Sequence, residues 1–492
     1  MRTKILELEA VSRQLEPDAQ ERAAVRGPLQ RYADEFLDNI ETLNAYNVTA
    51  DKGAGLLNSP ISEEPVPVGE ALELLRRNVD FPGLNPASGG HLGYIPGGGI
   101  YYSALGDYLA DVFNRYSGVF FASPGAVRME NMLIRWVAET FGYPADAAGN
   151  LTSGGSLANL IGIVTARDAQ GIRAAEIARA VIYLSAQAHH SVDKAIRIAG
   201  LRECVVRHLP LDERYRIIPA ELARQIEADL AQGLRPFLAI ASAGTTDVGA
   251  IDPLDEIGAI CQRYGLWYHI DAAYGGFFVL TAEGKKKLRG IELADSLVVD
   301  PHKGLFLPYG LGIALVRDKQ ALQAAHFYQA NYMQDARDDN EEASPADLSP
   351  ELTKHFRGLR FWLPLKLHGV APFRACLEEK LLLARYFHTE AQKLGFETGP
   401  VPELSVVTYR YIPRAIADDL AKVNAFNKKL LEAVVADGRV FISSTLLEGK
   451  FTLRLACLAF RTRLKTIDLL LQVLREKAML LENELSWLDE VN

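Results

Sequence analysis

A lysine lies directly after a predicted turn, in the run Asp300-Pro301-His302-Lys303. The residues before this run, 296–299, have the apolar character of a buried strand, and the apolar run GLFLPYGLG follows it. A lysine in this position is expected in a half-enclosed pocket, where desolvation and nearby cations lower the pKa of its amino group. A neutral amino group can form an imine with a carbonyl compound. Taken alone, the run also fits a surface lysine at the end of a strand.

A second chemical signal is the aspartate in His269-Ile270-Asp271-Ala272-Ala273-Tyr274-Gly275-Gly276. An aspartate at the end of an apolar strand can point a buried carboxylate at a cationic ring nitrogen. The small side chain of Ala273 and the two glycines would let a flat ligand lie close to the backbone. An aspartate that caps a helix is the alternative interpretation.

Three further segments place polar groups after apolar runs. Glycines and hydroxyls precede the helical pattern LANLIGIVTAR in 151–156, which favours an anion site at a helix N-terminus. His189 and His190 follow the run VIYLS, where a histidine could stack on a planar ring. Thr246 follows the run FLAIASA. A serine cap, a structural histidine and a turn threonine are the simpler alternatives.

The elements that must position these residues alternate between strand and helix from about 150 to 317. The predicted strands are 180–184, 204–209, 236–241, 266–270, 296–299 and 312–316. This alternation predicts an α/β fold with a mostly parallel sheet and helices on both faces. Each chemical segment comes just after a strand or just before a helix, so we expect the segments to meet at the carboxyl ends of the strands.

The rest of the chain suggests three domains. We expect a helical N-terminal segment over 1–95 that packs on a partner subunit, a large domain over 96–370, and a small C-terminal α/β domain over 371–492. Strands 404–411 and 451–458 and helices 415–437 and 464–481 are predicted in the small domain. Residues 318–355 are acidic and poor in apolar side chains, which predicts a long mobile loop.

The composition limits the possible partners and the location. The net charge of −9, from 62 acidic and 53 basic residues, argues against nucleic acid or an anionic membrane. The N-terminus MRTKILELEAVSRQLEP has no apolar core of a secretion signal, and no stretch of about 18 apolar residues predicts a membrane span. The four cysteines are far apart, as expected for reduced thiols and not for disulfides or a metal site. We therefore expect a cytoplasmic protein without a metal ion.

The chemical segments together resemble the group II pyridoxal-phosphate-dependent decarboxylases of fold type I, the family of aromatic-L-amino-acid and glutamate decarboxylases. The motifs that carry the resemblance are TSGGSLANL, QAHHSVDKA, GTTDVGAIDPL, WYHIDAAYGG and ADSLVVDPHK. The similarity extends from about residue 90 to about residue 462. It implies pyridoxal 5'-phosphate as cofactor, a small-molecule substrate that is an amino acid, and a homodimer.

The resemblance also implies roles for single residues. Lys303 would bind the cofactor covalently, and Asp271 would keep the ring nitrogen protonated so that the ring can accept electrons. His189 would stack on one face of the ring, with His190 as the alternative, and Ala273 would pack on the other. The remaining expected contacts are Thr246 beside the histidine and a phosphate cup of Gly154, Gly155, Ser156, Ser296 and His302.

The type of reaction and the substrate rest on further positions. By resemblance, Tyr332 on the acidic loop protonates the substrate α-carbon after carbon dioxide leaves, where related aldehyde synthases tend to have Phe. Tyr94, Gly97 and Tyr116 are the expected substrate contacts. The family usually has Thr at position 97 and, in aromatic members, Trp at position 304, where this chain has Gly. Aromatic amino acids remain the default substrates.

Several other functions fit the same fold. An aldehyde synthase is disfavoured by Tyr332 and His189. An aminotransferase or a carbon–carbon lyase is disfavoured because the motifs TSGGSLANL and DPHK are closer to those of the decarboxylases. A non-catalytic protein that binds the cofactor would be expected to lack Lys303 or Asp271, and both are present. We therefore expect a carboxy-lyase that converts an L-amino acid to its amine and carbon dioxide.

Overall fold

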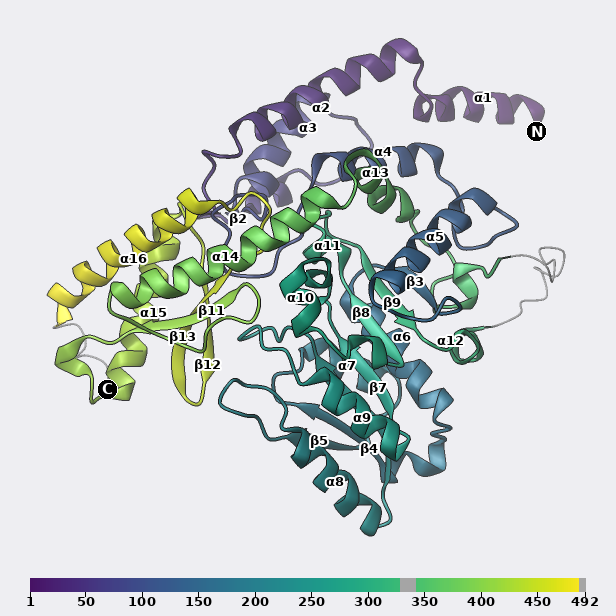
Figure 1. The fold of residues 1–492 in the computed structure, drawn as a ribbon. Coiled ribbons are helices and arrows are strands. Elements are labelled where there is room, and N and C mark those ends of the chain that lie inside the picture. The colour runs from purple at the N-terminus through teal and green to yellow at the C-terminus, as the bar shows by residue number, and fades with distance from the viewer. Residues whose placement is uncertain (328–341, 486–492) are drawn as a thin grey trace.

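The computed structural model describes residues 1–327 and 342–485, and a seven-stranded sheet forms its centre (Figure 1). The strand order is β3-β9-β8-β7-β6-β4-β5, and only β9 runs antiparallel to its neighbours in this sheet. The strands are β3 (Ala148–Thr152), β4 (Ala180–Ser185), β5 (Val205–Leu209), β6 (Arg235–Ser242), β7 (Trp267–Asp271), β8 (Ser296–Val299) and β9 (Gly312–Val316). The expected α/β fold with a mostly parallel sheet is confirmed.

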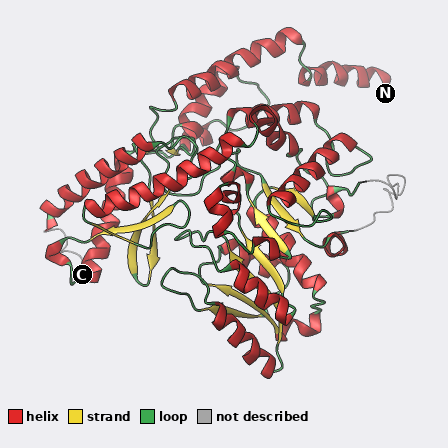
Figure 2. Cartoon of the chain, viewed as in Figure 1, coloured by secondary structure: helices red, strands yellow, loops and turns green. Residues whose placement is uncertain are grey.

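Both faces of this sheet are buried, which explains why its strands are apolar along most of their length. On one face, α5 (Pro124–Thr140), α8 (Pro219–Ala231) and α9 (Leu254–Tyr264) pack on side chains such as Tyr183 and Ile270. On the other face, α6 (Gly155–Ala169) and α7 (His190–Ile198) pack on neighbours such as Ile182. Figure 2 shows helices on both sides of the central strands.

The remaining helices of the middle of the chain surround this core. They are α4 (Tyr101–Phe113), α10 (Ala282–Lys287), α11 (Pro301–Gly304), α12 (Lys319–His326) and α13 (Gly358–His368). The sequence predicted six of the seven strands of the large sheet. It missed β3, whose residues AGNLT contain a polar Asn150 that is fully buried.

A second, four-stranded antiparallel sheet lies in the C-terminal part, with the order β10-β11-β13-β12. Its strands are β10 (Phe396–Thr398), β11 (Val406–Tyr411), β12 (Ser443–Leu447) and β13 (Lys450–Ala456). The helices α14 (Ala371–Lys393), α15 (Leu420–Asp437) and α16 (Leu464–Asn483) share an apolar core with it. The sequence predicted β11 and β13 but not the short β10 or β12. The expected domain boundaries at 95/96 and 370/371 stay a prediction.

The N-terminal part is helical, as predicted, and lies to one side of the large sheet (Figure 1). It contains α1 (Arg2–Ser12), α2 (Ala19–Asn39) and α3 (Val68–Leu75), together with the short pair β1 (Tyr46–Asn47) and β2 (Gly83–Leu84). None of these three helices has a residue that is buried within the chain. Across residues 1–327 and 342–485, no helix is long and apolar enough to cross a membrane.

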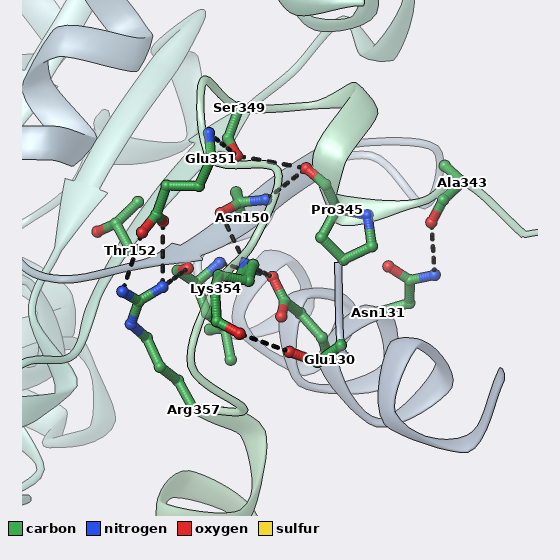
Figure 3. A network of polar contacts seen from close by, with 12 residues as sticks. Glu130, Asn131, Asn150, Thr152, Ala343, Pro345, Ser349, Glu351, Lys354 and Arg357 are labelled. Carbon is green, nitrogen blue, oxygen red and sulfur yellow. Dashed lines mark hydrogen bonds and ion pairs between the residues drawn. The ribbon is translucent and has the colours of Figure 1, made fainter. Parts of the chain in front are cut away.

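Two parts of the segment expected to be a long loop, 318–327 and 342–355, lie within the described residues. The segment contains α12, and residues 342–357 are held by a network of polar contacts (Figure 3). Lys354 Nζ donates to Glu130 Oε1 at 2.7 Å and to Asn150 Oδ1 at 2.9 Å, and Asn150 Nδ2 donates to the carbonyl of Pro345 at 2.9 Å. Burial lowers the pKa of Lys354, and Glu130 offsets part of this shift. Residues 328–341 of this segment, which include Tyr332, lie outside the described residues.

Replacing Lys354 with Met should lower the free energy of unfolding by about 3–5 kcal/mol, because the Glu130 carboxylate would stay buried without a cation. Denaturant-induced unfolding of the variant measures this loss. The double variant Lys354→Met/Glu130→Gln should recover most of the stability, since no charge is then left unpaired.

A double variant as unstable as the single one would contradict the ion-pair explanation. The exposed pair Lys465–Glu41, with side chains 70% and 73% exposed, gives a matched control. Replacing Lys465 with Met should leave the unfolding midpoint unchanged.

Candidate active site

The carboxyl ends of the parallel strands meet at a cavity of about 540 Å³. Its volume is in the range of small-molecule sites. Most of the residues singled out from the sequence line this cavity. They are Tyr94, Gly154, Gly155, Ser156, His189, Thr246, Asp271, Ala273, His302 and Lys303. The structure therefore brings the motifs together at one edge of the sheet, as expected.

Lys303 lies on the short helix α11, immediately after β8. Its Nζ is 3.0 Å from Oδ2 of Asp300, a residue that is 1% exposed. Burial alone would lower the pKa of Lys303, but the carboxylates of Asp300 and Asp271 outweigh it, and the pKa is raised above its ordinary value. The expectation that this site lowers the pKa of the lysine is therefore wrong, because the charges closest to the amino group are negative.

Asp271 is the last residue of β7, and both of its carboxylate oxygens accept hydrogen bonds. Oδ1 accepts from the backbone N–H of Ala273 at 3.1 Å, and Oδ2 accepts from Nδ2 of Asn159 at 3.0 Å. These two donors fix the orientation of the carboxylate. The carboxylate is thus a fixed negative charge in the cavity wall.

The structure distinguishes the two adjacent histidines. His189 lines the cavity, whereas His190 is exposed, although the two rings are 4.0 Å apart. His189 is the N-cap of α7, and its Nδ1 accepts from the backbone N–H of Ser191 at 3.2 Å. Burial is the main cause that lowers the pKa of His189, so the ring is neutral at neutral pH.

The N-terminus of α6 forms another wall of the cavity. Gly154 has a φ of 152°, and no acidic residue occupies the first turn of this helix. A Cβ atom at Gly155 would lie 3.0 Å from Oδ2 of Asp300 and 3.3 Å from the Cβ of Ala273, so the backbone approaches this wall closely. Free N–H groups at a helix N-terminus attract anions. His302, on α11, lines the same cavity.

Three predicted site residues do not line the cavity. Ser296 is at the far end of β8, where its Oγ contacts Trp267 Nε1 and His269 Nδ1, so we do not retain it in the phosphate cup. Tyr116 lies near Gly118, and Gly97 packs against the ring of Tyr309. Tyr332 lies outside the described residues, so its placement stays a prediction.

Close contacts explain why glycines occupy positions 97 and 98. A Cβ atom at Gly97 would lie 2.8 Å from the ring of Tyr309, and one at Gly98 would lie 2.1 Å from the backbone of Phe306. The backbone N–H of Gly98 donates to the carbonyl of Leu307 at 2.8 Å. A Thr at position 97 would therefore require the ring of Tyr309 to move, whereas a side chain at position 98 would meet backbone.

Asn159, Asp300 and Arg454 are among the polar residues of the cavity wall to which sequence reasoning gave no role. Arg454 comes from β13 of the small sheet and is 4% exposed. Its Nε donates to the carbonyl of Asp247 at 2.7 Å, Nη1 donates to Oγ of Ser443 at 2.9 Å, and Nη2 donates to the carbonyl of Thr246. An arginine at a buried position of the apolar run FTLRLA was the available signal.

Comparison with known families agrees with this geometry. The family described as the pyridoxal-dependent decarboxylase conserved domain matches residues 86–412, more than half of the chain. The chain belongs to the pyridoxal-dependent decarboxylases. Membership makes pyridoxal phosphate its cofactor and the decarboxylation of an amino acid its class of reaction.

Individual relatives of this pyridoxal-dependent decarboxylase carry several names. An aromatic-L-amino-acid decarboxylase of Bacillus atrophaeus is 34% identical over 92% of this chain and 95% of that protein. A phenylacetaldehyde synthase of Petunia hybrida is 29% identical over 92% of this chain and 93% of that protein. The structure of Oryza sativa TDC with PLP and tryptamine has a TM-score of 0.90 at 24% identity, over 95% of this chain and 99% of that one.

The residues of the cavity fit pyridoxal phosphate. The group carries a phosphate dianion, an aldehyde and a ring nitrogen that becomes cationic on protonation. The cavity offers the N-terminus of α6, the amino group of Lys303 and the carboxylate of Asp271, one partner for each. The distinct chemistry of these three partners, and not the volume alone, supports the fit.

The pair between Asp300 and Lys303 leads to a pH-dependent prediction. A raised pKa keeps Lys303 protonated at neutral pH, and only the neutral amine can attack an aldehyde. Asp300→Asn removes the negative charge, so the pKa of Lys303 should fall and the rate of covalent capture of pyridoxal phosphate at pH 7 should rise severalfold. Stopped-flow absorbance or borohydride trapping measures this rate.

The rise should also occur with pyridoxal, which lacks the phosphate, because the effect acts through the lysine. A rise with pyridoxal phosphate alone would point to a change at the phosphate instead. A pH profile of capture that is the same in both proteins would contradict the assigned pair.

Proposed function

We propose that this enzyme decarboxylates an L-amino acid, with aromatic amino acids as the default, to the corresponding amine and carbon dioxide. The observation that carries this proposal is the convergence of Lys303, Asp271 and the N-terminus of α6 on one cavity. The 34% identity to an aromatic-L-amino-acid decarboxylase of Bacillus atrophaeus supports the choice of substrate class.

Different residues of the cavity would bind different groups of the cofactor. Lys303 would bind its aldehyde, Asp271 would pair with its ring nitrogen, and His189 and Ala273 would pack against the ring. Thr246 would contact the ring, and the α6 N-terminus would hold the phosphate, together with Gly154, Gly155, Ser156 and His302. When bound, pyridoxal phosphate accepts the electron pair that remains after the carboxylate leaves.

Arg454 is the candidate for holding the substrate carboxylate. A guanidinium has five N–H groups, and the three donated to Thr246, Asp247 and Ser443 leave two for an anion. Tyr94, which is 53% exposed, lies at the same cavity and can contact the substrate side chain. Because Arg454 belongs to β13, the small sheet would take part in recognition of the substrate.

An aldehyde synthase is the second candidate function. The relative named phenylacetaldehyde synthase in Petunia hybrida covers nearly the whole chain at 29% identity. The two functions differ in what happens at the substrate α-carbon after decarboxylation, and Tyr332 is the expected proton donor of a decarboxylase. Tyr332→Phe would then shift the products from amine towards aldehyde.

The products formed from L-phenylalanine, L-tyrosine, L-tryptophan and L-glutamate test the proposal. We expect one aromatic amino acid to give carbon dioxide and amine in equal amounts. Lys303→Ala should reduce this rate at least about a hundredfold, while Ala at the exposed Lys194 leaves it unchanged. Aldehyde with ammonia and peroxide would favour the synthase, and no carbon dioxide from any substrate would contradict both functions.

We also propose that the protein is a homodimer in which α1 packs on the second copy. The apolar side chains of Ile5, Leu8 and Val11 on this helix are 55%, 58% and 64% exposed. None of the residues of α1 is buried within the chain. A second copy would cover this apolar surface and so explain why it is present.

Sedimentation velocity should therefore find two copies of the chain in one particle. The variant Leu8→Lys/Val11→Lys should weaken the association at least about tenfold, because burying an unpaired ammonium costs several kcal/mol. Leu230→Lys, at a position that is 50% exposed on α8, is the matched control. A variant that associates like the control would contradict the role of α1.

A further inference from the structure

Behind the Asp271 carboxylate, a chain of buried hydrogen bonds leads away from the cavity. Trp267, His269 and Asp271 are alternate residues of β7, so their side chains lie on one face of the strand. That face is covered by α6, which contributes Asn159. All four side chains are at most 9% exposed, as is that of Ser296 on the neighbouring β8.

The bonds follow one another without a gap. Trp267 Nε1 lies 2.8 Å from Ser296 Oγ, which lies 2.7 Å from His269 Nδ1. His269 Nε2 lies 2.8 Å from Asn159 Oδ1, and Asn159 Nδ2 lies 3.0 Å from Asp271 Oδ2. The chain thus connects an indole N–H with the carboxylate in the cavity wall.

The direction of every bond is fixed by the chemistry of the two ends. A carboxylate only accepts, so Asn159 must present its NH₂ group to Asp271 and its oxygen to His269. Burial lowers the pKa of His269 to about 4, so the ring is neutral and has a single N–H. This N–H must be on Nε2, which faces an acceptor, and Nδ1 then accepts from the hydroxyl of Ser296. An indole nitrogen only donates, which completes the order.

Every donor in this chain therefore points towards Asp271. Hydrogen bonds aligned in this way polarise one another, and the last donor becomes stronger than an isolated amide. A stronger donor favours the charged form of the carboxylate and holds its plane in place. The backbone of α6 packs closely on the ring of His269, because a Cβ atom at Gly162 of this helix would lie only 2.7 Å from the Cε1 of the ring.

Asn159 also connects this chain to His189. Its Nδ2 donates to Ser191 Oγ at 3.1 Å, in addition to Asp271. Ser191 Oγ lies 2.7 Å from His189 Nδ1, which already accepts from the backbone N–H of Ser191. His189 Nδ1 is therefore an acceptor, and the single N–H of this neutral ring is on Nε2. One amide thus orients both the carboxylate and the histidine.

We propose that Asn159, His269 and Ser296 are positioning residues that hold Asp271 charged and in register with the protonated ring nitrogen of the cofactor. Asn159 acts directly on the carboxylate, and the other two act through it. The inference rests on the proposed role of Asp271. It gives Ser296 a place in the site different from the phosphate cup expected from the sequence.

Ser296→Ala tests this proposal without changing a residue of the cavity wall. The measurement is the dissociation constant of pyridoxal phosphate, compared with that of the analogue whose ring nitrogen is replaced by C–H. The wild-type protein should prefer pyridoxal phosphate. In the variant the preference should fall about fivefold, the effect of one lost hydrogen bond, while binding of the analogue stays the same.

Ser103→Ala is the matched control, because this buried serine donates to the carbonyl of Arg360, takes no part in the hydrogen bonds that lead to Asp271 and should keep the wild-type preference. If Ser296→Ala does not fold, Trp267→Phe removes the first donor and should lower the preference in the same direction. An unchanged preference in the folded variant would overturn the proposal. A wild-type protein without any preference would instead overturn the role of Asp271, and this inference with it.

Discussion

The arrangement depends on one electrostatic constraint, which is that a buried ammonium needs negative charge close by. Lys303 meets this need with Asp300, three residues before it on the same turn, and with Asp271 on the neighbouring strand. The parallel order of β7 and β8 brings the two carboxylates to the same edge of the sheet. The sheet topology therefore decides the charge state of the lysine before any cofactor binds.

The cavity is built by two parts of the fold. The large sheet supplies the lysine, the carboxylates and the anion-binding helix terminus, while β13 of the small sheet supplies Arg454. Hydrogen bonds from Arg454 to the carbonyls of Thr246 and Asp247 connect the two sheets at the cavity itself. The same groups that shape the cavity thus also hold the small sheet against the large one.

Much of this could be predicted from the sequence, because strands buried on both faces are apolar throughout and the motifs follow them directly. The strand β3 was not predicted, because the hydrogen-bond partners of its buried Asn150 are Pro345 and Lys354, which are distant in sequence. The raised pKa of Lys303 was not predicted, because it depends on the distance between Lys303 and Asp300, and the sequence does not give this distance. Ser296 was misplaced because it is the first residue of β8, away from the cavity, and its hydroxyl contacts His269 on the neighbouring strand.

The backbone around the three consecutive glycines at positions 97–99 limits variation of the chain next to Lys303. The backbone N–H of Gly98 donates to the carbonyls of His302 and Leu307, which flank the turn that carries Lys303. A Cβ atom at Gly98 would lie 2.1 Å from the backbone of Phe306, so a larger side chain at this position would require the turn to shift. This stretch of backbone therefore restricts which side chains the chain can accept next to the lysine, whichever substrate the cavity takes.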